Sequence, residues 1–171
     1  WYQRTIDACT ELHGVDHPHT LYSRMGLANA LANFGRLEEA LAESEELMRA
    51  ARERLGDGHV GVAIALSTHA RLLRSADRIE EAEELQQRVV TGFAGVFGEA
   101  DPRTLDVKTT HGAMLRHLGR LDESEDVTLR ALAPFEPIDE NVRAKAEIAA
   151  ALSSLGHTYR AQGRIDRALE C

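Results

Sequence analysis

Histidine is the residue type in this 171-residue chain that most directly suggests metal binding or acid–base catalysis. The chain has eight histidines, but they are scattered. His17 and His19 stand two residues apart in a predicted linker. His111 and His117 are six residues apart and fall on different sides of a predicted helix. A metal site needs such side chains to converge with further ligands on one point, so the spacing predicts no metal site.

The short motifs of common enzyme and nucleotide sites are also missing. The sequence contains no GxxxxGK[ST] phosphate loop, GxSxG nucleophile elbow, HExxH zinc motif or GxGxxG dinucleotide loop. Adjacent acids such as Glu80 and Glu81 fit a solvated helix face better than a general acid–base pair. We therefore predict a protein that is not an enzyme, with no catalytic residue and no cofactor.

Charge and hydrophobicity exclude two further classes. The formal net charge is −8, which argues against binding to nucleic acid or to an anionic membrane. No apolar run approaches the ~20 residues that a membrane-spanning helix needs. With 43% hydrophobic and 28% charged residues, the composition favours a folded chain rather than a disordered one.

Cysteine and lysine usage indicate the source and compartment. Cys9 and Cys171 lie near opposite ends without CxxC spacing, so we expect two free thiols in a reducing cytoplasm. Lys108 and Lys145 are the only lysines among 20 basic residues, and alanine is abundant. This bias towards arginine and alanine suggests a GC-rich bacterial genome.

A hexapeptide pattern occurs four times along the chain. It reads GRLEEA from Gly35, DRIEEA from Asp77, GRLDES from Gly119 and GRIDRA from Gly163, in steps of 42, 42 and 44 residues. Apolar residues at helical spacing precede and follow each copy, so every period predicts two helices, here called A and B. Glycine, or Asp77 in its place, can take the left-handed conformation that ends the A helix. The acids then fall in the first turn of the B helix, where the helix dipole favours them.

A second pattern recurs between the predicted hairpins. It reads GVDHPHTL from Gly14, GDGHVGVA from Gly56 and GEADPRTL from Gly98, again 42 residues apart. Glycine would close the B helix, and Asp16, His17 and Asp101 are candidates for capping the next A helix. His17 and His59 share one register, which favours capping or linker packing over a ligand role. The fourth junction, 133–144, has two prolines and two extra residues and predicts a longer, irregular connection.

These patterns predict an all-α fold of stacked hairpins. The expected helices span 18–34, 37–55, 59–75, 78–96, 102–118, 121–133, 141–162 and 165–171. We expect one solenoid over 1–171 that divides into 1–13, 14–55, 56–97, 98–138 and a truncated 139–171. Residues 1–13 align with the end of a B helix, so we expect a fragment of a longer array, with open ends that could self-associate.

The chain resembles the tetratricopeptide repeat family, in the 42-residue form found in kinesin light chains and many bacterial proteins. Small residues recur at the eighth and twentieth positions of each repeat: Ala28, Ala70, Gly112 and Gly156, then Ala40, Ala82, Ser124 and Ala168. His69 and His111 replace the usual apolar seventh residue, and we expect hydrogen-bonded core histidines there rather than a proton relay. The resemblance implies an α-solenoid that coils as a right-handed superhelix, with A helices on its concave face and B helices on its convex face.

The resemblance also implies which A-helix positions face the concave groove. The candidates for partner binding are Asn29, Asn33, Arg71, Arg74, Arg116, His117, His157 and Arg160. Arg74, Arg116 and Arg160 share the twelfth position, and the A helices are net positive although the chain is acidic. These arginines could be solvated or paired with acids on adjacent helices, bind an acidic peptide, or form subunit contacts.

Two classes of function follow from this organisation. The first is a protein–protein interaction scaffold that binds a peptide or partner surface, of acidic character, in the groove. The alternative is a sensor, regulatory or oligomerisation array within a larger bacterial ATPase or transcription regulator. A phosphate loop or a DNA-binding domain in neighbouring sequence would favour the alternative.

Overall fold

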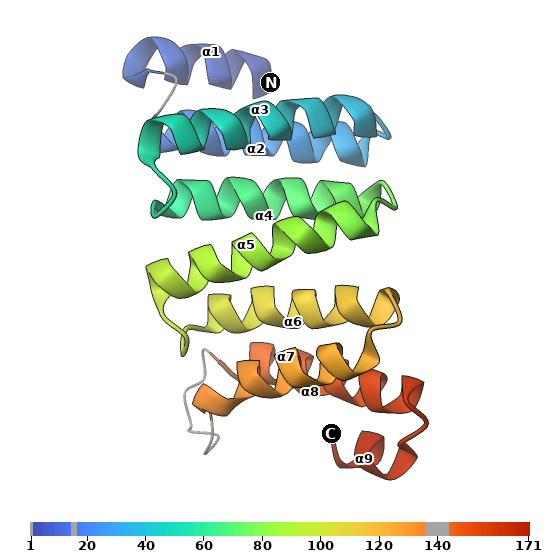
Figure 1. Cartoon of the computed structure of the whole chain (residues 1–171). Coiled ribbons are helices and arrows are strands. Elements are labelled where there is room, and N and C mark those ends of the chain that lie inside the picture. The colour runs from blue at the N-terminus through green and yellow to red at the C-terminus, as the bar shows by residue number, and fades with distance from the viewer. Residues whose placement is uncertain (1, 15–16, 136–143) are drawn as a thin grey trace. The chain divides into compact units, whose positions relative to one another are not determined.

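The computed structural model describes residues 2–14, 17–135 and 144–171. These residues form helices and one short 3₁₀ turn, and no strand occurs among them (Figure 1). The helices are α1 (Tyr2–His13), α2 (Pro18–Asn33), α3 (Leu37–Leu55), α4 (Val60–Ser75), α5 (Ile79–Phe97), α6 (Pro102–His117), α7 (Leu121–Leu132), α8 (Lys145–Ala161) and α9 (Ile165–Glu170), with the 3₁₀ turn at Ala133–Phe135. The predicted cap Asp16 and the predicted helix start at 141 lie outside the described residues.

The predicted breaks between A and B helices are confirmed. The backbone φ angle is positive at each of them: 77° at Gly35, 59° at Asp77, 76° at Gly119 and 76° at Gly163. The next residue's N–H then bonds back to a carbonyl five residues earlier, as in Arg36 N to Leu31 O at 2.9 Å. This left-handed helix end reverses the chain so that each B helix can pack antiparallel to its A helix.

The arginine of the hexapeptide has a local role that the sequence analysis missed. Its guanidinium forms a bidentate salt bridge with the glutamate three residues later. Nε and Nη2 donate to the two carboxylate oxygens at 2.6–2.7 Å in the pairs Arg36–Glu39, Arg78–Glu81 and Arg120–Glu123. The fourth copy has Arg167 at the acid's place, and Arg164 bonds instead to Glu125 of the preceding repeat at 2.7 Å. These exposed pairs join the residue before the helix to its first turn in the B helices α3, α5 and α7.

The linker pattern is explained by capping of the A helices. His17 Nδ1 accepts a bond from His19 N at 3.3 Å, His59 Nδ1 from Gly61 N at 3.0 Å, and Asp101 Oδ1 from Arg103 N at 2.9 Å. The capping expected of His17 and Asp101 is therefore confirmed, and His59 does the same in the intervening repeat. Each cap satisfies one of the N–H groups that the first turn of a helix leaves free.

Removing the Asp101 cap should destabilise the chain measurably. We expect Asp101→Ala to lower the free energy of unfolding by about 0.5–1 kcal/mol, because the Arg103 N–H loses its acceptor. Asp101→Asn is the matched control, since its side-chain oxygen can still cap. Urea denaturation checks both variants, and an alanine variant as stable as wild type would contradict the capping role.

The stability of wild type and that of Asp101→Asn should depend differently on pH. The hydrogen bond from Arg103 holds the pKa of Asp101 below its ordinary value. A carboxyl with a lowered folded-state pKa adds stability above its unfolded pKa and loses that contribution as the pH falls through the folded value. The stability difference between wild type and Asp101→Asn should therefore shrink as the pH falls from neutral into the acid range, in a series of urea titrations.

The helices group into two compact units, Trp1–Gly92 and Phe93–Cys171, called unit 1 and unit 2. In unit 1, α2 packs against α1, α3 and α4, and α3 also packs against α4. In unit 2, α6, α7 and α8 pack against one another and α9 packs on α8. The unit 2 core consists of Leu105, Ala131, Leu132, Ala144, Ile148, Ala151, Leu155 and Tyr159.

A seam of buried hydroxyl groups joins the helices of unit 2. Ser124 Oγ donates to the Gly112 carbonyl at 2.7 Å and shares a 3.0 Å bond with Thr158 Oγ1. Thr128 Oγ1 donates to the Ser124 carbonyl at 2.8 Å. Small and hydroxyl-bearing side chains therefore hold α6, α7 and α8 together, and Gly112 and Ser124 among them are recurrent small residues of the repeat. Within the described ranges, no helix is long and apolar enough to cross a membrane.

Candidate functional site

Four of the eight predicted binding residues lie together in unit 2. Arg116 and His117 at the end of α6, with His157 and Arg160 on α8, line a surface hollow of about 540 Å³. Ala161 completes this lining, called here the basic hollow, and no acid among the described residues is part of it. The four residues meet because α6 and α8 are packed A helices that run in the same direction (Figure 1).

The charge of Arg116 is not neutralised by its contacts. Its Nη1 donates to the backbone oxygen and to the hydroxyl of Ser154, both at 3.2 Å. Burial lowers the pKa of Arg116, and the positive charge of Arg160 lowers it further. Within the described residues, the structure shows neither an ion pair nor a side-chain hydrogen bond for Arg160. Two guanidinium groups therefore share one hollow without a compensating carboxylate.

The other four predicted residues lie on the A helices of unit 1. Arg71 on α4 donates to the side-chain oxygen of Asn29 on α2, one repeat earlier. Asn33 and Arg74 are exposed at the ends of the same two helices. The Arg71–Asn29 bond shows that equivalent A-helix positions face one side within this unit.

Pairing with acids on adjacent helices is not supported for Arg74, Arg116 and Arg160, called here the arginine column. In the part of the chain that the structure describes, none of Arg74, Arg116 and Arg160 forms an ion pair with an acid. Arginines elsewhere do so, for example Arg24 with Glu43 at 2.6 Å. The column arginines thus stay available for solvent or for a partner. Arg74 belongs to unit 1, so the structure places only Arg116 and Arg160 beside each other.

An acid pair at the other end of unit 2 was missed by the sequence analysis. Asp106 on α6 and Glu147 in the first turn of α8 lie close enough that the charge of Glu147 raises the pKa of Asp106, in addition to the larger effect of burial. Glu147 Oε2 is buried and has no hydrogen-bond partner. Asp106 occupies a groove position of its repeat, and Glu147 lies one helical turn before the equivalent Ala150. The repeat register therefore gave no signal for the pair, because Glu147 stands outside the aligned positions.

The core histidines behave as structural residues. Ser44 Oγ and His69 Nδ1 are 2.8 Å apart, and burial lowers the pKa of His69, which confirms the expected hydrogen-bonded histidine. His111 is also buried. In the described residues, no group of three histidine, cysteine or acidic side chains is arranged to hold a metal ion.

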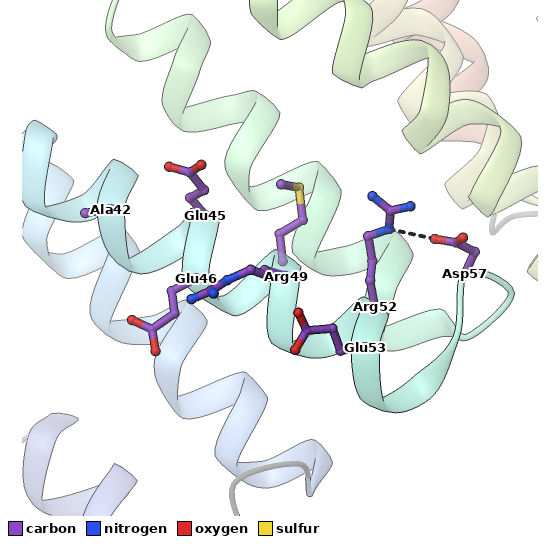
Figure 2. A pocket seen from close by; sticks show the side chains of 8 residues that line it. Ala42, Glu45, Glu46, Arg49, Arg52, Glu53 and Asp57 are labelled. Atoms are coloured by element: carbon purple, nitrogen blue, oxygen red, sulfur yellow. Dashed lines mark hydrogen bonds and ion pairs between the residues drawn. The ribbon is translucent and has the colours of Figure 1, made fainter.

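A second hollow of about 660 Å³ lies along α3 in unit 1 (Figure 2). It mixes both signs of charge: Glu45, Glu46, Arg49, Arg52, Glu53 and Asp57 line it with Ala42 and Met48. Arg52 Nε bonds to Asp57 Oδ1 at 2.8 Å, so part of this charge is already neutralised (Figure 2). The charged residues that line the basic hollow, in contrast, are all basic.

Comparisons with known structures agree with this architecture. The BtubC (BKLC) protein from P. vanneervenii is 22% identical, with a TM-score of 0.86 over 99% of this chain and 67% of that one. A putative kinesin light chain from Podospora anserina, with nearly identical TPR-like repeats, is 20% identical, with a TM-score of 0.82 over 99% of this chain and 79% of that one. At these identities the likeness shows the fold, and it confirms the predicted stack of helical hairpins. Among curated proteins, none matches the sequence.

Family models identify the repeat itself. One tetratricopeptide repeat model matches residues 20–95, and a second matches residues 148–171. Together they cover more than half of the chain, and their repeats coincide with the hairpins of the structure. The chain therefore belongs to the tetratricopeptide repeat family.

Proposed function

We propose that this chain is a protein–protein interaction module and that the basic hollow binds acidic side chains of a partner peptide. Membership of the tetratricopeptide repeat family supports the scaffold role. The observation that carries the finer proposal is the pairing of Arg116 with Arg160 in one hollow without an acid. A carboxylate entering there would reduce their mutual repulsion.

The chemistry of arginine suits this ligand. Each guanidinium offers a planar fork of donors that can hold a carboxylate by two hydrogen bonds. Arg116 already uses Nη1 on Ser154, which fixes the orientation of its remaining donors. We propose that Asn29, Asn33, Arg71 and Arg74 contact partners in the same way on unit 1. The arginine-rich composition and the free thiols of Cys9 and Cys171 support a bacterial, cytoplasmic setting.

The test is an affinity measurement with a defined acidic peptide. We expect Arg116→Ala/Arg160→Ala to bind an aspartate-rich decapeptide about 2- to 30-fold more weakly, since two partly exposed contacts contribute roughly 0.2–1 kcal/mol each. Arg130→Ala is the matched control, because Arg130 lies exposed on α7 and pairs with Asp126. The measurement is isothermal titration at low and at moderate salt, where wild-type binding should weaken as salt rises.

The basic hollow is excluded as the peptide site if wild type and the double variant bind the peptide with equal affinity and without salt dependence. Thermal unfolding of each variant, followed by circular dichroism, confirms that the compared proteins are folded.

A further inference from the structure

Three histidine rings meet where α1 joins α2. The ring centroids of His13 and His17 lie 4.5 Å apart in a stacked arrangement, and those of His17 and His19 lie 5.2 Å apart. The centroids of His13 and His19 are 6.2 Å apart, so each ring of this set, called here the histidine cluster, is close to both others. His13 is the last residue of α1, His17 caps α2, and His19 lies in the first turn of α2.

The histidine cluster is not arranged as a metal centre. Stacked rings present their faces to one another, whereas a metal ion needs ring nitrogens that converge on one point. In the described ranges, no group of three histidine, cysteine or acidic side chains could hold a metal ion. The reversible chemistry that stacked imidazoles retain is the uptake of protons, because an unperturbed imidazole titrates near pH 6.5.

The cap that His17 provides exists only while its ring is neutral. His17 Nδ1 accepts a hydrogen bond from His19 N at 3.3 Å, which requires a lone pair on that nitrogen. In imidazolium both ring nitrogens carry a proton, so Nδ1 can no longer accept. The new positive charge would also lie at the N-terminal end of α2, where the helix dipole disfavours a cation. Protonation of His17 therefore replaces a favourable contact with an unfavourable one.

The charges around His17 oppose its protonation. Its pKa lies below the ordinary value because the ring is partly removed from water, and because charge on His13 and His19 repels a proton. His13 belongs to α1 and His19 to α2, and no described charged group of α3, which also packs on α2, acts on that pKa. Asp16, the residue before His17, lies outside the described residues. Full protonation of the histidine cluster places three positive charges on rings whose centroids are at most 6.2 Å apart.

The helix that precedes the histidine cluster is held weakly. Among the described side chains of α1, at residues 4–13, none is fully buried. Ile6, Cys9 and Thr10 are half-buried, and the others are exposed. Detached from α2, a helix of 12 residues such as α1 is only marginally stable in water. Repulsion at its last residue, His13, therefore acts on an element with little burial to oppose it.

We propose that the histidine cluster is a pH-sensitive switch that releases α1 from α2 in mildly acidic solution. Proton uptake removes the cap of α2, and repulsion among three imidazolium rings moves the end of α1 away. Release uncovers the side of α2 on which α1 packs. The equivalent caps of the next two repeats respond differently. His59 caps α4 as a single ring, and Asp101 caps α6 with a carboxylate that remains an acceptor at this pH.

The test is amide hydrogen–deuterium exchange of the full chain, followed by mass spectrometry between about pH 8 and about pH 5. We expect exchange in α1 to rise about 2- to 30-fold beyond its intrinsic pH dependence, the factor that corresponds to the loss of one cap. Because the folded-state pKa of His17 is lowered, its contribution to stability is present above about pH 6.5 and is lost as the pH falls below that value. Exchange in α6 is the internal reference and should show no such rise, since its cap is Asp101.

Three variants assign the response to its residues. His17→Asp keeps a capping oxygen and removes the central imidazole, so exchange in α1 should follow the intrinsic pH dependence alone. His13→Gln/His19→Gln keeps the cap and removes both repelling charges, so the rise should begin at a higher pH than in wild type. His59→Asp, at the equivalent cap of α4, is the matched control and should leave the response of α1 unchanged.

The inference is overturned if wild-type α1 shows no rise beyond the intrinsic dependence, or if His17→Asp shows the same rise as wild type. A rise of equal size in α6 would also overturn it, because acid would then loosen the chain as a whole. Circular dichroism at neutral pH verifies that each variant is folded. If His17→Asp does not fold, the glutamine double variant decides, since a rise that begins at the wild-type pH would contradict the role of the histidine cluster.

Discussion

Gly112→Ala is expected to lower the free energy of unfolding by about 1–3 kcal/mol, the usual cost of overpacking a filled interior. A Cβ at this position would lie 2.5 Å from Thr128 Oγ1 and 3.4 Å from the Ser124 carbonyl oxygen. Thr128 cannot easily move away, because it is buried and its hydroxyl is bonded to that same carbonyl. The added methyl group must therefore push α6 and α7 apart. Urea denaturation measures the effect.

A glycine elsewhere in unit 2 provides the control. Gly95 lies within α5, and the space beside it is open. A new Cβ there would have no neighbour within 4 Å apart from the adjoining backbone of its own helix. Gly95→Ala should therefore raise the free energy of unfolding by about 0.5–1 kcal/mol, through helix propensity alone. If Gly112→Ala stabilised the chain to the same extent, the close approach of α6 and α7 would be contradicted. Gly112→Ala/Thr128→Ala should lose less than the sum of its single variants.

Ala40→Leu is expected to destabilise the chain by a similar ~1–3 kcal/mol. Ala40 lies on α3, the B helix that packs against α2, and its side chain is completely buried. Three added carbon atoms have no space at such a position unless the two helices separate. Thermal unfolding by circular dichroism should show a clear decrease in melting temperature.

Ala42→Leu on the same helix is the matched control. Ala42 is exposed, so the larger side chain should change the free energy of unfolding by no more than about 0.5 kcal/mol. Equal melting temperatures for wild type and both leucine variants would show that Ala40 does not lie in the seam between the helices.

The repeat architecture was predictable because its signals are local. Glycine at 35, 119 and 163, and Asp77 between them, mark positions where the backbone must take a positive φ angle. A helix boundary set by one residue's conformation can be found from that residue's type and period. The salt bridge between Arg36 and Glu39 was equally local, since residues three apart are neighbours on a helix. It was overlooked because the acid had already been explained by the helix dipole.

The candidate site was only partly predictable. His157 and Arg160 meet Arg116 and His117 because equivalent positions of packed A helices face the same side, which the repeat register predicts. The acid pair could not be found in that way. Glu147 precedes the aligned repeat positions and follows a junction whose irregular sequence hides the start of the helix. The burial of its carboxylate is set by packing against other helices, which the local sequence does not record.

The most direct test of the basic hollow is to observe its arginines while an acidic peptide binds. The side-chain Nε–Hε NMR signals of Arg116 and Arg160 should shift together on titration with an aspartate-rich decapeptide. The signals of Arg36 and Arg130, which already pair with Glu39 and Asp126, should stay in place. Shifts confined to those two arginines, with none at Arg116 and Arg160, would contradict the account and place the binding surface on the B helices.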